Sequence, residues 1–203
     1  MNTVAKYISG VFAFAIFAAS TACCAPRIFV ASDYGASGDG TTLDTSSIQK
    51  AIDAAAAVGG IITFKPGTYL TGSLFFKSGV TLDLPEGALL IGSQKLEDYP
   101  MLPTRIAGIE MTWPSALINV RGQDDVKLTG KGSIDGDGPF WWKQYWNLRA
   151  RYESRGLRWA ADYDARRPRL VLIQDSQGNR RQNSIHRERL SQCPTGRLPP
   201  RSS

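Results

Sequence analysis

Cysteine and histidine are scarce in this sequence. Its three cysteines are Cys23, Cys24 and Cys193, so none lies between residues 25 and 192. A domain in that interval has no disulfide framework and must be stabilised by its hydrophobic core. The single histidine, His186, lies between Ile185 and Arg187. We expect no metal site and no cofactor.

Long hydrophobic runs are also missing. Residues 7–19 are apolar and follow Lys6, but about 18 residues are needed to span a bilayer. The following "STACCAP" offers small residues for cleavage after Ala22 or Ala25. Residues 1–25 therefore read as a signal peptide, which predicts a secreted or periplasmic protein with no membrane contact after cleavage. The alternatives are a short membrane anchor and lipid attachment at Cys23, although "STAC" lacks the large aliphatic residue expected there.

The positive charge is concentrated at one end of the chain. The formal net charge is +6, and residues 177–203 hold six arginines and one glutamate. The rest of the chain is almost neutral, so its charge does not indicate a nucleic-acid partner. The basic segment also lacks interleaved aromatic residues.

One amphipathic helix is indicated after residue 44. Asp44, Thr45 and Ser46 are suitable N-caps, and Ser46 with Gln49 fits a capping box. Gly59 and Gly60 indicate where the helix stops. Four apolar residues recur at helical spacing and predict its buried face: Ile48, Ala51, Ile52 and Ala55.

After this helix the hydrophobic pattern changes to a period of two. Short segments such as "IITF", "GVTLDL", "ALINV" and "RLVLI" are bounded by Gly, Pro or charged residues. This pattern predicts an all-β domain, which is either an antiparallel sandwich or a parallel β-solenoid. The single preceding helix favours the solenoid, because the end of a stack needs a cap.

An aromatic insertion, "GPFWWKQYWNLRARYESRGLRWAADYD", interrupts the strands. It looks helical in part and reads as an excursion from the β body. We expect Trp141 and Trp142 to pack the insertion onto that body. For Trp159 the pattern favours packing and stacking on a sugar ring equally, and we take Trp159 as the candidate substrate-binding residue.

Two motifs carry a resemblance to a known family. "DYGASGDGTTLDTSSIQKAIDAAAAVGG", with the strands that follow it, resembles the N-terminal cap and first coils of the pectin-lyase-like right-handed parallel β-helix. "IDGDGPFWW" is similar to bacterial members of glycoside hydrolase family 28, the polygalacturonases. The resemblance runs from about residue 34 to residue 176. It implies the N-terminal part of a β-helix domain over residues 26–176, in a monomer that acts on galacturonan or rhamnogalacturonan.

The family hydrolyses α-1,4-galacturonosyl bonds with inversion, using two carboxyl groups about 6.5–9.5 Å apart. The resemblance places these groups on Asn-Thr-Asp and Asp-Asp motifs, followed by Gly-His-Gly and Arg-Ile-Lys. Only an Asp-Asp pair is present, Asp124-Asp125, and it lies early, in "RGQDDVKL". We interpret it as a turn, and we assign no catalytic residue.

The other prominent carboxylates also read as structural. Asp135 and Asp137 lie among glycines in "IDGDG", where Asp commonly bonds to nearby backbone N–H groups. Asp39 and Asp44 are interpreted in the same way, as turn and cap residues.

In the family, "LVLIQDS" is followed by further coils that carry the catalytic groups. Here the arginine-rich residues 177–203 follow, with few aliphatic residues. We expect this tail to be disordered, and we hypothesise a truncation near Gln177, by a shifted reading frame or an altered gene end. The chain is then an inactive relative of polygalacturonases. The alternative is a non-catalytic carbohydrate-binding or structural β-helix.

Overall fold

The computed structural model describes residues 27–177 and 180–181. The predicted signal peptide, the alternative of lipid attachment at Cys23, and most of the predicted disordered tail lie outside these residues. No helix among the described residues is both long and apolar enough to cross a membrane.

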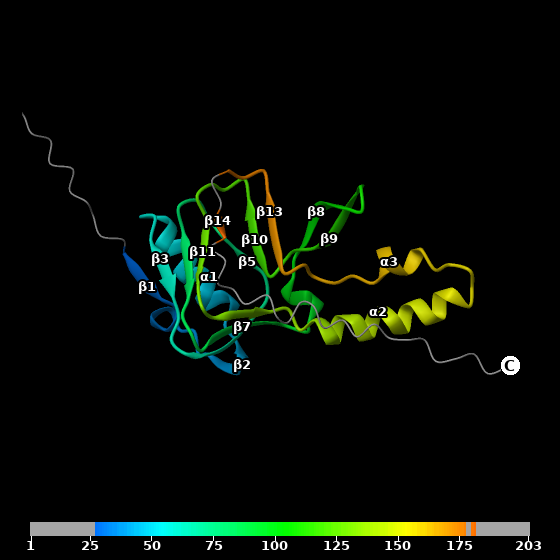
Figure 1. Cartoon of the computed structure of the whole chain (residues 1–203), viewed down its shortest axis with the longest axis horizontal. Helices are drawn as coiled ribbons and strands as arrows, with labels where there is room; N and C mark the ends of the chain where they lie inside the picture. The colour runs from blue at the N-terminus through cyan, green and yellow to red at the C-terminus, as the bar shows by residue number, and fades with distance from the viewer. Residues whose placement is uncertain (1–26, 178–179, 182–203) are drawn as a thin grey trace, which may run out of the picture.

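The body of the molecule is a stack of coils in which three sheets run side by side (Figure 1). The first sheet contains β1 (Ile28–Val30), β3 (Ile61–Thr63), β6 (Thr81–Leu84), β11 (Lys127–Gly130) and β14 (Arg180–Arg181). The second contains β2 (Asp39–Leu43), β4 (Gly67–Thr71), β7 (Ala88–Gly92) and β12 (Ser133–Asp135). The third contains β5 (Leu74–Phe75), β10 (Ile118–Arg121) and β13 (Val171–Gln174).

Every pairing within these three sheets is parallel. From β3 onward, and apart from the hairpin of residues 101–114, successive strands visit the first, second and third sheet in turn and then return to the first. This is the right-handed parallel β-helix that the sequence predicted. It excludes the antiparallel sandwich.

The interior is filled by columns of aliphatic side chains. Ile62, Leu82 and Leu128 are register partners on adjacent strands of the first sheet, and each is at most 4% exposed. The period of two in the sequence creates this column, because alternate residues of a strand face the same side. Full burial of such a side chain stabilises the fold by about 1.5–3 kcal/mol.

The helix α1 (Thr45–Ala56) packs against β1, β3 and β5 at one end of the stack. It also contacts the short helix η1 (Ala31–Tyr34), which precedes it in the chain. The predicted apolar face is confirmed, because Ile48, Ala51, Ile52 and Ala55 are fully buried. The backbone N–H of Gly60 donates to the Ala55 carbonyl at 2.9 Å, which ends the helix near the predicted glycines.

The predicted capping box was wrong. The side-chain amide of Gln49 donates to the Phe75 carbonyl at 2.9 Å and accepts from the Phe75 N–H at 2.9 Å. Gln49 therefore joins the helix to the third sheet instead of closing the helix start. Asp44 occupies the N-cap position without a side-chain cap bond, and its carboxylate accepts from the N–H groups of Ser37 and Gly38.

Two long insertions leave the stack where the chain passes from the second sheet to the third. Residues 93–117 contain η2 (Leu96–Asp98) and an antiparallel hairpin of β8 (Met101–Ile106) and β9 (Ile109–Pro114). Residues 136–170 contain α2 (Gly138–Glu153) and α3 (Ala160–Asp164), which project from the body as an arm (Figure 1). The helical excursion was predicted, whereas the hairpin was not.

The last described strand departs from the expectation for the tail. β14 pairs in parallel with β11, with Arg180 opposite Lys127 and Arg181 opposite Leu128. A short strand therefore continues the first sheet in a segment for which we expected none.

Candidate functional site

The two insertions meet beside the third sheet, and we call this region, residues 93–117 and 136–170, the insertion corner. Three hydrogen bonds attach the hairpin to its surroundings. Arg121, at the end of β10, donates to the Pro103 carbonyl at 3.2 Å. Arg169, just before β13, donates from Nη2 to the Thr104 hydroxyl at 2.7 Å. Trp113 donates from Nε1 to the Arg167 carbonyl at 2.8 Å.

A small second core holds the base of the corner. Tyr99, Leu117 and Trp141 are buried together, and the rings of Tyr99 and Trp141 lie edge to face with centroids 6.1 Å apart. The Tyr99 hydroxyl donates to the Ser93 carbonyl at 2.9 Å. Burial, with smaller contributions from Asp98 and Asp137, raises the pKa of Tyr99 above its usual range. The predicted packing role of Trp141 is confirmed.

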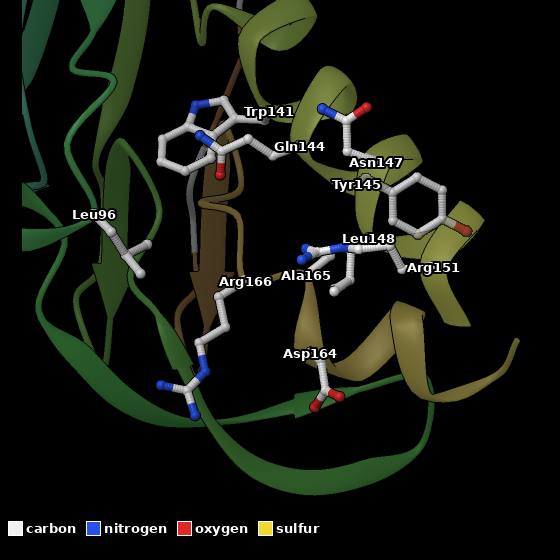
Figure 2. A pocket seen from close by; sticks show the side chains of 10 residues that line it. All are labelled: Leu96, Trp141, Gln144, Tyr145, Asn147, Leu148, Arg151, Asp164, Ala165 and Arg166. Atoms are coloured by element: carbon white, nitrogen blue, oxygen red, sulfur yellow. The ribbon is translucent and has the colours of Figure 1, made fainter. Parts of the chain in front are cut away.

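A cavity of about 410 Å³ opens between α2 and the segment that follows α3. Figure 2 shows its walls: Gln144, Asn147 and Arg151 come from α2, Arg166 comes from the facing segment, and Leu96 stands on a third side. Two amides, two guanidiniums and the carboxylate of Asp164 therefore line an open space. The amides and guanidiniums donate hydrogen bonds to hydroxyl and carboxylate oxygens.

Three tryptophans of the arm remain exposed to solvent. The exposed fractions of Trp142, Trp146 and Trp159 are 37%, 53% and 71%. An arginine stacks over each ring, at 5.0, 5.0 and 5.2 Å from the centroid, and these are Arg167, Arg149 and Arg158. Trp142 also packs edge to face on Tyr145, so its predicted packing role holds only in part.

Trp159, the sequence candidate for sugar stacking, lies outside the cavity. It occupies the N-cap position of α3 and is the most exposed of the arm's tryptophans. Its ring is largely exposed to solvent, with Arg158 over the ring at 5.2 Å from the centroid. Its role as a substrate-binding residue therefore stays a prediction.

The carboxylates singled out in the sequence make structural hydrogen bonds, but Asp135 is the last residue of β12 and does not lie in the predicted turn. Asp124 accepts from the Gln177 N–H at 2.6 Å, and Asp125 has a left-handed backbone with φ of 56°. Asp135 accepts from the Asp137 N–H at 2.9 Å. Asp137, with φ of 49°, occupies the N-cap position of α2 and accepts from the Gln94 amide. These bonds fix the local backbone.

Asp39 is similarly engaged in local structure. It accepts from the N–H groups of Thr41 and Thr42, each at 2.7 Å, and from both of their hydroxyls and that of Ser37. The bonds from Thr42, then those from Thr41 and Ser37, hold the pKa of Asp39 well below its usual value. Such a carboxylate is a poor proton donor at neutral pH.

Sequence reasoning missed two groups of residues. Arg121 and Arg169 meet the hairpin only after β10 and β13 have paired, and the one signal was an arginine at the end of each apolar segment, "ALINVR" and "RLVLI". Asn119 is 1% exposed, accepts from the Ala116 N–H, and donates to the carbonyls of Ala116 and Leu74. A polar residue inside "ALINV" was its only signal.

Comparisons with known proteins agree with this architecture. The family described as "Rhamnogalacturonase A/epimerase, pectate lyase-like" matches residues 28–83. An exo-poly-alpha-D-galacturonosidase of Dickeya chrysanthemi is 38% identical over 133 residues, covering 62% of this chain and 21% of that enzyme. The solved family 28 exopolygalacturonase of Yersinia enterocolitica superposes with a TM-score of 0.62 at 26% identity, covering 77% of this chain and 34% of the other.

These findings confirm the resemblance to the polygalacturonases of glycoside hydrolase family 28. The resemblance is partial, because the chain spans about a fifth of the Dickeya enzyme's length. The chain is also similar to a protein that is not named as a polygalacturonase. Plasmin and fibronectin-binding protein A of Streptococcus pneumoniae (strain ATCC BAA-255 / R6) is 37% identical over 109 residues, covering 52% of this chain and 15% of that protein.

Proposed function

We propose that the chain supplies the N-terminal coils of a glycosidase of the polygalacturonase type, and that these coils bind galacturonan without hydrolysing it. The whole enzyme cleaves α-1,4-galacturonosyl bonds of pectin. The similarity to polygalacturonases supports the substrate, and the insertion corner supplies the surface. We also propose that residues 1–25 are removed as a signal peptide and that the protein acts outside the cytoplasm as a monomer.

The observation that carries the binding role is the imbalance of charge at the insertion corner. Arg151, Arg166 and Arg169 lie there, and Arg121 lies beside it at the end of β10. None of these four arginines forms an ion pair with a carboxylate among the described residues. Galacturonan is a polyanion with one carboxylate per sugar. Partly exposed arginines attract such a polymer, and added salt weakens the attraction.

The absence of hydrolysis is proposed on chemical grounds. Inversion needs a carboxylic acid and a carboxylate on opposite faces of the sugar. Asp124 and Asp135, one from each acidic motif, accept backbone hydrogen bonds from Gln177 and Asp137 and thereby support the fold. General acid and base groups each contribute about 10²–10⁴-fold, so without them the rate should be undetectable.

Affinity electrophoresis tests the binding role. The purified chain should be retarded in a gel that contains polygalacturonate, and the retardation should decrease as salt is added. A gel with neutral galactan serves as the matched control, because it presents the same sugar skeleton without the carboxylate. Equal retardation in both gels, or none in either, would contradict galacturonan binding.

A second candidate is a non-catalytic β-helix that binds a protein partner. The similarity to the pneumococcal binding protein and the exposed tryptophans of the arm favour it. Surface plasmon resonance against immobilised plasmin and fibronectin would distinguish it. Saturable binding that survives excess oligogalacturonate would support this second role.

A further inference from the structure

Two arginines converge on one strand of the hairpin. Arg121 donates to the Pro103 carbonyl and Arg169 donates to the Thr104 hydroxyl, and these two acceptors belong to consecutive residues of β8. Arg121 is the last residue of β10, and Arg169 lies two residues before β13, the strand that pairs with β10 in the third sheet. Their positive charges are therefore brought together under the hairpin.

The pair lacks the anion that its geometry calls for. Neither guanidinium forms an ion pair with a described carboxylate. Nε of Arg169 is buried and has no hydrogen-bond partner among the described residues. Burial, and secondly the charge of Arg121, lower the pKa of Arg169 from its usual value. A buried donor without a partner and a like charge close by are both unfavourable.

A purely structural role explains only part of this arrangement. One N–H of each arginine attaches the hairpin, and a neutral donor could do the same. The unused Nε and the neighbouring like charge remain without explanation. An anion between the two guanidiniums would satisfy the Nε and offset the repulsion, since an arginine binds a carboxylate through two parallel N–H groups.

One hydrogen-bond acceptor and one donor for sugar hydroxyls lie close to the arginine pair. Gln174 is the register partner of Arg121 on β13, and its side-chain oxygen is buried without a donor among the described residues. The Thr104 hydroxyl accepts from Arg169, which leaves its own proton for a further acceptor. The two guanidiniums could therefore bind a carboxylate, and the Gln174 oxygen and the Thr104 hydroxyl could bind sugar hydroxyls.

We propose that Arg121 and Arg169 form a binding site for the carboxylate of a uronate sugar. The choice of a uronate over other carboxylates rests on the proposed function. The arginine pair itself identifies an anion, so an inorganic anion is included as a probe in the test.

The experiment is calorimetric titration of the full chain with trigalacturonate, with the neutral galactose trisaccharide, and with sodium sulfate, all at constant ionic strength. Arg121→Gln and Arg169→Gln are compared with Arg155→Gln, which removes an exposed arginine of the arm. We expect trigalacturonate to bind the wild type and the Arg155→Gln control equally. Each of the other two variants should weaken binding about 10-fold or more, as expected for loss of a charged hydrogen bond.

Each other outcome has a defined meaning. Unchanged trigalacturonate affinity in both arginine variants overturns this site and leaves galacturonan binding intact. Sulfate binding that equals trigalacturonate binding overturns the uronate assignment. No trigalacturonate binding by any form overturns both this site and the proposed function.

A structural role is separated by the melting temperature of the unliganded protein. Arg121→Gln should leave it unchanged or raise it, because the substitution removes a like charge next to Arg169. Arg121→Lys and Arg169→Lys keep the charge and should retain part of the affinity. Loss of folding in the glutamine variants, together with full affinity in the lysine variants, would assign the arginines to hairpin attachment alone and overturn the proposal.

Discussion

The coiled body and the insertion corner differ in how their large side chains are placed: those of the body are buried in columns, whereas many of those in the corner are partly exposed. In the body, each buried side chain stacks on an equivalent side chain of the next coil, as Leu82 does between Ile62 and Leu128. In the corner, large aromatic and cationic side chains stand partly in solvent, with Trp159 71% exposed. The body therefore supplies most of the buried apolar contacts that stabilise the fold, whereas the corner exposes aromatic and cationic side chains that a ligand could contact. Substitutions should separate the two regions clearly.

The largest effect is expected in the stacked core. Leu82→Ala should lower the free energy of unfolding by about 2–5 kcal/mol, because it opens a cavity between fixed neighbours. The measurement is urea unfolding followed by circular dichroism. Leu157→Ala is the matched control, since Leu157 in the arm is 46% exposed and should change stability by less than about 0.5 kcal/mol. Equal losses in both variants would contradict the division into two regions.

A smaller effect is expected where the body meets the corner. Asn119→Ala should lower the free energy of unfolding by about 1–3 kcal/mol, because buried backbone groups of Ala116 and Leu74 lose their partner. Asn147→Ala, at an exposed position of α2, is the matched control. Urea unfolding measures both, and a harmless Asn119→Ala would show that the Asn119 bonds contribute little.

The smallest effect concerns Asp39, at the exposed start of β2. The folded-state pKa of Asp39 lies below its unfolded value, so its contribution to stability is present above the unfolded pKa of 3.8 and is lost as the pH falls below it. The melting temperature of the wild type should therefore fall more between pH 5 and pH 2 than that of Asp39→Asn. Identical slopes for the two proteins would show that the bonds to Thr41 and Thr42 have no net effect.

The coiled body was largely predictable from the sequence, for a local reason. A period of two followed by turn residues determines which side chains face inward, and a helix with one apolar face can cover the end of the stack. The structural role of Asp135 was predictable for the same reason, since it bonds to a residue two positions away.

The helical excursion of the corner and the packing of Trp141 were predictable, but the contacts that attach the hairpin were not, because they join residues far apart in the chain. Arg169 meets Thr104 and Trp113 meets the Arg167 carbonyl only after the coils have stacked. Gln49 misled us because its spacing from Ser46 satisfied a local rule, while Phe75 offered two backbone partners in place of the helix start.

The central proposal, binding of galacturonan without hydrolysis, is tested most directly by one incubation. The purified chain is mixed with polygalacturonate, and the reducing ends released are measured over time alongside bound polymer, with an Asp135→Asn/Asp137→Asn variant as control. We expect bound polymer and no release of reducing ends from either protein. Release by the wild type that the double variant abolishes would contradict the proposal and make Asp135 and Asp137 catalytic instead of purely structural residues.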